Sequence, residues 1–239
     1  MDCQRLTPEP QDGSSPAYKQ DDDMLVGRTM DQFVTLPDGT MLVLNGATNG
    51  TAGFANQTLY VPSLAQMPFF QSLASGPDGT PAIYNPNAPK DSRWSSVGLA
   101  STSIARMYHS VALLLPDASV LIAGSNPSID VELTAPYPTT YTAEIFYPPY
   151  CSSSVRPQVM GVLPTLSYGG PYFNLSVSAT SYTGNGAAAN TTVVLSRGGF
   201  STHAMNMGQP HVQLNNTYAS TTTGRTSCTS RRYRRTRTC

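Results

Sequence analysis

Charged side chains are scarce in this chain of 239 residues, in which Asp, Glu, Lys and Arg together make up 12% of the sequence. Soluble globular domains usually contain about twice that share, so long helices built on Glu, Lys and Ala are not expected, and neither is a coiled coil. No apolar run approaches the ~18 residues that a membrane-spanning helix requires. The first residues contain neither a basic segment nor an apolar segment of the kind that forms a signal peptide.

Cysteine is also rare, and its spacing excludes two common kinds of site. The four cysteines are Cys3, Cys151, Cys228 and Cys239. Because no two of them form a C-x-x-C pair, the sequence does not support a zinc ribbon or a thioredoxin-like redox site. In contrast, five Asn-x-Ser/Thr triplets favour a secreted origin, since such triplets accept N-linked glycans. They begin at Asn49, Asn56, Asn174, Asn190 and Asn215.

Glycine, proline and tyrosine are abundant, with 19, 20 and 13 residues. Together with many Val, Leu and Thr residues, this composition favours an all-β protein. The formal net charge of zero conceals a division, because six arginines after Gly224 give the last 15 residues a charge of +6 and leave −6 on the rest. A mildly acidic body argues against nucleic acid as a partner.

One pattern occurs twice, and each copy predicts a β-hairpin. In residues 33–44, two apolar runs flank Pro37-Asp-Gly39, where proline sets φ for the first corner of a turn and glycine permits the φ that follows. Residues 110–124 repeat the pattern around a second Leu-Pro-Asp, and a glycine follows the second run in both copies. Shorter strand-like segments come after the hairpins, at 82–86, 93–94 and 143–148. This arrangement predicts blades of a kelch-type propeller, with repeats of ~50 residues and a long insertion near residues 50–80.

Changes in composition and hydrophobic pattern along the chain predict three segments. Residues 1–150 are expected to form part of the propeller, after an irregular polar stretch over residues 1–23. A small β-sandwich is predicted over residues 151–220, and residues 221–239, rich in Arg and Thr without periodicity, are expected to form a disordered tail. The predicted sandwich strands lie at 172–178 and 191–196.

Several of these segments together resemble the copper-radical oxidases, and within them the glyoxal oxidase branch. The similar motifs follow the family's order over residues 1–219. They are Asp22-Asp-Met with Arg28-Thr-Met30, Leu36-Pro-Asp-Gly39, residues 45–53, Tyr108-His109-Ser110 with Leu-Leu-Leu-Pro-Asp after it, residues 143–150, and residues 200–208. The resemblance implies the fold that the pattern also predicts, which is all-β: a partial kelch-type propeller followed by an immunoglobulin-like, early-set β-sandwich.

The resemblance also implies one copper ion, with Tyr108, His109 and His203 as metal ligands. Tyr108 would be the axial ligand and the catalytic base that takes the proton of the substrate hydroxyl. Imidazole nitrogens with a phenolate oxygen suit tetragonal Cu(II) better than zinc or magnesium. Because neighbouring residues of a strand face opposite sides, Tyr108 and His109 can share a metal only if the backbone bends between them. The third histidine, His211, has no counterpart among the family's ligands.

The sequence departs from the family in two respects. The family's radical centre is a tyrosine that is thioether-bonded to a cysteine, and residues 1–239 offer no candidate, because Cys3 stands in a different motif and no tyrosine in residues 1–100 has the right context. Two hairpins are also fewer than the four blades that close a propeller. We therefore expect a fragment of a secreted oxidase, and the change of composition after residue 220 resembles a shift of reading frame.

The leading hypothesis is the family's reaction, in which small aldehydes or hydroxycarbonyls are oxidised to carboxylic acids and O₂ is reduced to hydrogen peroxide. This chain keeps the copper ligands but lacks the radical pair, so it is expected to be inactive by itself. The alternative is a non-catalytic extracellular β-protein that binds glycans or the cell wall through Trp94 and the tyrosines. A third hypothesis, a tail that contacts the phosphates of nucleic acid or membrane, is disfavoured because a frameshift also generates Arg and Thr. No nucleic-acid or membrane partner is expected.

Overall fold

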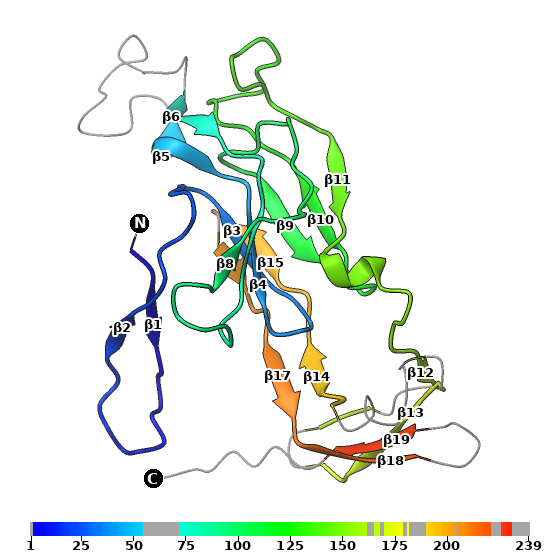
Figure 1. The fold of residues 1–239 in the computed structure, drawn as a ribbon. Helices are drawn as coiled ribbons and strands as arrows, with labels where there is room; N and C mark the ends of the chain where they lie inside the picture. The colour runs from blue at the N-terminus through cyan, green and yellow to red at the C-terminus, as the bar shows by residue number, and fades with distance from the viewer. Residues whose placement is uncertain are drawn as a thin grey trace. The chain divides into compact units, whose positions relative to one another are not determined.

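The computed structural model describes residues 2–54, 72–161, 165–167, 170–178, 181, 190–203, 205–220 and 226–230. Strands dominate these residues, which also include a short 3-10 helix, η2 (Pro149–Ser152). The all-β fold class is therefore confirmed (Figure 1). The described part of the chain contains no helix that is long and apolar enough to cross a membrane.

The chain divides into two compact units that are not contiguous in sequence. Unit 1 comprises residues 1–148 together with 198–209, and unit 2 comprises residues 149–197 together with 210–239. A short segment from the second half of the chain thus belongs to the unit formed by the first half.

The first predicted hairpin is the centre of a four-stranded antiparallel sheet in unit 1. The sheet has the order β3-β4-β7-β8. Its strands are β3 (Gln32–Thr35), β4 (Met41–Leu44), β7 (Ala82–Tyr84) and β8 (Trp94–Ser95). The turn between β3 and β4 follows the sequence, because Gly39 has φ +83° and the Asp38 carboxylate accepts hydrogen bonds from the backbone N–H and the hydroxyl of Thr40. Val34, Leu36 and Leu42 from this hairpin are fully buried and supply core.

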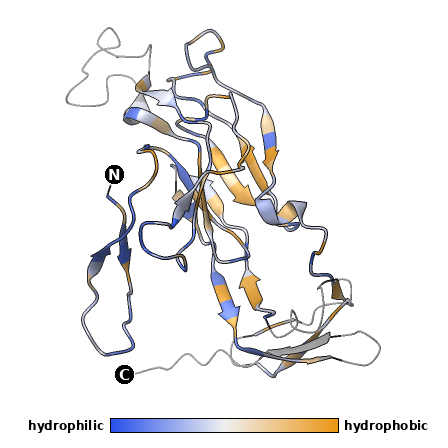
Figure 2. Ribbon diagram, in the orientation of Figure 1, coloured by the Kyte–Doolittle hydropathy of each residue, from blue (hydrophilic) through white to orange (hydrophobic). Residues whose placement is uncertain are grey.

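The second predicted hairpin forms a three-stranded sheet with the order β11-β10-β9. Its strands are β9 (Val111–Leu114), β10 (Val120–Ala123) and β11 (Ala143–Phe146), and β9 and β10 are among the most hydrophobic segments in Figure 2. Arg106, buried just before β9, ties the sheet together. Its guanidinium donates to the Glu144 carboxylate at 2.7 and 2.9 Å and to the backbone carbonyls of Gly124 and Thr142.

Two further hairpins lie in unit 1, and one of them differs from the sequence expectation. The expected insertion near residues 50–80 has a strand at each end, β5 (Ala47–Phe54) and β6 (Ser72–Pro77), and these two strands pair antiparallel. Residues 1–23, expected to be irregular, contain the hairpin β1 (Gln4–Leu6) and β2 (Tyr18–Gln20). That expectation was wrong because β1 and β2 are exposed on both faces and largely polar (Figure 2), so they carry no apolar alternation to reveal them.

Unit 2 contains a four-stranded sheet and a separate pair of strands. The sheet has the order β12-β13-β19-β18, and β14 pairs with β17. The strands are β12 (Val159–Met160), β13 (Phe173–Val177), β14 (Val193–Ser196), β17 (His211–Leu214), β18 (Asn216–Ser220) and β19 (Thr226–Ser230). The predicted disordered tail is wrong for β19, which pairs along both sides, with β13 and β18. Backbone pairing between two neighbours holds a strand that has no apolar pattern, and the other residues of 221–239 lie outside the described part.

The buried carboxylate of Asp21 connects the β1–β2 hairpin to the four-stranded sheet β3-β4-β7-β8. The Asp21 carboxylate accepts a hydrogen bond from the Tyr84 hydroxyl and forms ion pairs with Arg93 and Arg5. Its side chain is 1% exposed. Burial by itself raises the pKa of Asp21, but the hydrogen bonds it accepts and the nearby arginines outweigh burial and lower the pKa to about 2.

We predict that Asp21→Asn destabilises the chain by roughly 2 kcal/mol, the scale of a lost charge-assisted hydrogen bond. Because the folded pKa is lowered, the ionised carboxylate stabilises the fold fully above the unfolded pKa near ~4, and this contribution is lost as the pH falls toward 2. Urea unfolding between pH 7 and pH 3 measures both effects.

The matched control is Asp12→Asn, because Asp12 lies in an exposed turn and accepts hydrogen bonds only within that turn, from Ser14. This control should leave the free energy of unfolding nearly unchanged. Equal effects at Asp21 and Asp12 would show that the buried carboxylate does not connect hairpin and sheet.

Candidate functional site

Tyr108 and His109 occupy the two corners of a β-turn immediately before β9. The backbone N–H of Ser110 donates to the carbonyl oxygen of Met107 at 3.1 Å, which closes the turn around them. His109 has φ +66°, in the left-handed region that the second corner of a type II turn requires. The backbone therefore bends at the position where a shared metal site requires it. Because Tyr108 and His109 lie in a turn and not in a strand, their side chains need not point to opposite faces.

The turn is held by contacts with the end of β10 and with β5. The Ser125 hydroxyl accepts a hydrogen bond from the backbone N–H of Met107 at 2.9 Å, and the N–H of Asn126 donates to the Tyr108 carbonyl at 2.8 Å. Gly124 lies so close that a Cβ there would be 2.9 Å from the His109 carbonyl oxygen. The glycine that follows the second apolar run thus admits the turn, and Ser125 and Asn126 fix it.

His203 occupies the corner of a second tight turn. The strands β15 (Phe200–Thr202) and β16 (Met205–Met207) form an antiparallel hairpin in which Thr202 pairs with Met205, so two residues make the loop. His203 has φ +51°, a left-handed value of the kind that the first corner of the primed hairpin turns requires. Both histidines of the predicted metal site therefore sit at turn corners with a left-handed backbone.

Side-chain amides dock this hairpin onto the first sheet. Gln209 behaves like a strand residue toward Thr35, because its amide oxygen accepts from the Thr35 N–H at 3.0 Å and its NH₂ donates to the Thr35 carbonyl at 2.8 Å. Asn206 donates to the carbonyl of Phe33 at 3.1 Å. The hairpin also packs against β9 and β3, which brings His203 to the turn that precedes β9.

The structure brings the rings of Tyr108, His109 and His203 together within unit 1. The ring centroids are 4.0 Å apart for Tyr108 and His109, 6.1 Å for Tyr108 and His203, and 6.3 Å for the two histidines. Tyr108 is half-buried and packs against the core cluster that contains Met30 and Met107. Burial lowers the pKa of His109, and the nearby His203 lowers it further, which favours the neutral imidazole that a metal ligand must be.

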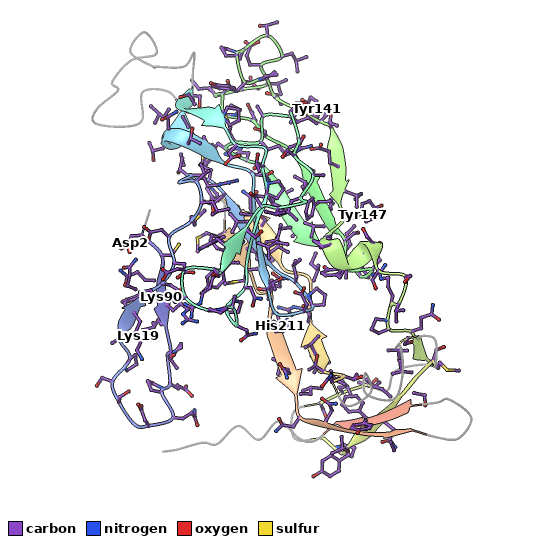
Figure 3. All side chains as sticks on the ribbon, viewed as in Figure 1. Asp2, Lys19, Lys90, Tyr141, Tyr147 and His211 are labelled. Carbon is purple, nitrogen blue, oxygen red and sulfur yellow. The ribbon has the colours of Figure 1, made fainter. Side chains whose placement is uncertain are left out.

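His211, the third histidine, belongs to β17 of unit 2 and is labelled in Figure 3. Its Nδ1 atom is buried without a hydrogen-bond partner. The sequence separated His211 from the other two because it matched none of the family's ligands, and the structure places it in the other unit.

The converging groups form a donor set of two imidazoles and one phenol. Among the described residues, no cluster of three or more His, Cys, Asp or Glu side chains offers another arrangement for a metal. Two nitrogen donors and a phenolate oxygen fit Cu(II), and the absence of thiolates argues against a structural zinc site. Sequence reasoning missed Ser125 and Gln209, which hold the two turns in place, because their contacts join segments that are far apart in the chain.

Two protein families match the chain. The family described as "Glyoxal oxidase N-terminus" matches residues 1–150, and "Galactose oxidase-like, Early set domain" matches residues 156–235. The second match ends beyond residue 220, which agrees with the strand β19 in the segment that was expected to be disordered.

Curated relatives include plant aldehyde oxidases. "Aldehyde oxidase GLOX" of Vitis pseudoreticulata is 35% identical over 196 residues, covering 81% of this chain and 33% of the relative. "Aldehyde oxidase GLOX1" of Arabidopsis thaliana is 31% identical over 217 residues, covering 89% of this chain and 31% of the relative. The chain thus spans about a third of the length of these relatives.

A solved structure of a fungal alcohol oxidase of the AA5 family, in complex with copper, is similar in fold. It superposes with a TM-score of 0.65 at 18% sequence identity, covering 97% of this chain and 41% of the oxidase. At this identity the match establishes the fold alone.

The left-handed φ of His109 yields a test of backbone strain. An L-residue in this conformation costs about 1–2 kcal/mol more than glycine does. We predict that His109→Gly is more stable than His109→Ala by about 1 kcal/mol, since both variants remove the imidazole and only glycine relieves the strain. Urea unfolding of the metal-free variants measures the difference.

His211 provides the control, since its φ is not positive. In β17, glycine should be less stable than alanine by about 0.5–1 kcal/mol. If glycine is also the less stable residue at position 109, the turn that presents His109 is not strained in solution.

Proposed function

The chain belongs to the glyoxal oxidase family, and from this premise we propose that it carries the copper-holding part of an oxidase that acts on small aldehydes or hydroxycarbonyls. The observation that supports the proposal most strongly is the convergence of Tyr108, His109 and His203 at two strained turns. The plant relatives are named as aldehyde oxidases, which supports the substrate class.

Each ring has a proposed role that its position allows. His109 and His203 would hold the copper through ring nitrogens. The Tyr108 ring lies beside both histidine rings, and its hydroxyl would take the proton of a substrate hydroxyl, as a general base does when it is within hydrogen-bond reach. Bound copper would polarise the substrate oxygen and accept one electron.

The electron balance requires a further group. Oxidation of an aldehyde hydrate to a carboxylic acid releases two electrons and two protons, and reduction of O₂ to hydrogen peroxide consumes them. A Cu(II)/Cu(I) couple would take up only one of these electrons. We propose that the second acceptor is the family's Cys–Tyr radical pair and that residues 1–239 do not contain it.

An extracellular location is part of the proposal. The asparagines of four glycosylation triplets lie in the described part of the chain, and all four are exposed, as acceptors of N-linked glycans must be. They are Asn49, Asn174, Asn190 and Asn215.

A non-catalytic, glycan-binding role is the second candidate, and exposed tyrosines favour it. Tyr141 and Tyr147 flank β11 and are 76% and 64% exposed (Figure 3), so their rings are available for stacking on a sugar. Trp94 is not available in the same way, because its ring packs against Tyr84 and its N–H donates to the Asp22 carbonyl. The converging rings of the candidate site have no part in this second function.

We predict that the chain binds one Cu(II) ion and that His109→Ala and His203→Ala each weaken binding by well over ~10-fold. Removal of a residue that only hydrogen-bonds to a metal ligand already costs about that much affinity, so removal of a ligand should cost more. His211→Ala is the matched control and should leave the affinity unchanged, since His211 lies in the other unit. Competition titration against a chelator measures the three affinities. Copper affinity that falls most in His211→Ala would refute the ligand assignment.

We further predict no oxidase activity from the copper-loaded chain alone. It should show an ordinary Cu(II) electron-spin signal, and hydrogen peroxide formation from methylglyoxal or glyoxal should stay at background, because a single one-electron acceptor is present. The control is copper in buffer with the His203→Ala variant. Copper-dependent peroxide formation above this control would mean that residues 1–239 contain a radical site after all.

A further inference from the structure

The hydroxyl of Thr202 contacts the ring of the neighbouring candidate ligand. Thr202 Oγ1 lies 2.8 Å from Nδ1 of His203, within hydrogen-bond distance. Thr202 is the last residue of β15, and its pairing with Met205 closes the two-residue loop. Both side chains are exposed, and the contact between them forms inside a short turn.

This contact restricts which nitrogen of His203 is available to a metal. A neutral imidazole has one N–H and one lone pair, on different nitrogens. Since Nδ1 is engaged with the Thr202 hydroxyl, Nε2 is the nitrogen that remains for a ligand. A hydroxyl can donate or accept, but a metal on Nε2 requires the proton on Nδ1, and that proton then points to Thr202.

We propose that Thr202 is a positioning residue: its hydroxyl accepts a hydrogen bond from Nδ1–H of His203, fixes that tautomer, and directs Nε2 to the metal. The proposal rests on the proposed function, because it assumes that His203 is a ligand. Partners that orient a ligating histidine through its second nitrogen commonly change metal affinity by ~10–100-fold when they are removed.

The backbone around the turn makes this orientation effective. The hairpin is docked onto β3 by the paired hydrogen bonds between Gln209 and Thr35, so the position of the His203 backbone is set. The remaining freedom is rotation of the imidazole about its side-chain bonds. A β-branched side chain has few rotamers, and Thr202 thus offers its hydroxyl from a nearly constant place.

A purely structural role for Thr202 makes a different prediction. Threonine favours strands because it is β-branched, and valine would serve a strand equally well. Thr202→Val keeps the branched shape and removes the hydroxyl, whereas Thr202→Ser keeps the hydroxyl and removes the branch. The two substitutions therefore separate hydrogen bonding from strand preference.

The experiment measures Cu(II) affinity by chelator competition in the full chain and in the variants Thr202→Val, Thr202→Ser and Ser201→Ala. We expect a loss of about tenfold or more in Thr202→Val and an affinity within about threefold of the original in Thr202→Ser. Ser201→Ala is the matched control on the same strand, since the Ser201 hydroxyl has no hydrogen-bond partner, and it should not change the affinity. Tight binding by Thr202→Val with weak binding by Thr202→Ser would overturn the proposal.

A second readout does not depend on the metal. Long-range ¹⁵N–¹H spectra of the metal-free chain report the tautomer of each histidine, and His203 should be mainly Nδ1–H in the original chain and in Thr202→Ser, and less so in Thr202→Val. A dominant Nε2–H tautomer in the original chain would contradict the proposal, whatever the variants do.

The outcomes also separate this proposal from the proposed function. If His203→Ala leaves copper affinity unchanged, His203 is not a ligand and the copper assignment fails. If His203→Ala weakens binding and Thr202→Val does not, the copper assignment stands and the role of Thr202 is refuted.

Discussion

Adjacent residues of a β-strand point to opposite faces, so Tyr108 and His109 share one side only because the chain turns between Met107 and Ser110. The turn requires a left-handed backbone at His109, a conformation that glycine would adopt at less cost. Hydrogen bonds that involve the Ser125 hydroxyl and the backbone N–H of Asn126 hold the turn in this strained conformation. Strained conformations of this kind persist where the surrounding structure determines them, and they cluster at functional sites.

The same solution occurs a second time, at the other histidine. His203 sits at the corner of a hairpin with φ +51°, and the hairpin belongs to unit 1 although the residues on both sides of it belong to unit 2. Polar contacts through Gln209 and Asn206 hold it there. The site thus depends on two tight turns from distant parts of the chain, each fixed by hydrogen bonds.

Local patterns in the sequence predicted much of this fold. Pro37-Asp-Gly39 and its repeat predicted the two central hairpins because turn residues between apolar runs act locally. The strand β19 was missed because pairing on both sides holds it without an apolar pattern. The bend at His109 was recognised as a requirement, but nothing local announces it, since histidine stands where a turn would prefer glycine. The amide pairing of Gln209 with Thr35 spans 174 positions, beyond the reach of any local pattern.

The central claim is that the two turns present Tyr108, His109 and His203 to one metal ion. A crystal structure of the copper-soaked chain, with anomalous diffraction at the copper edge, tests it most directly. The account predicts one strong anomalous peak among the three rings, with His203 bound through Nε2 and both histidines still at positive φ. A principal peak at His211, or three rings that no longer converge, would contradict it.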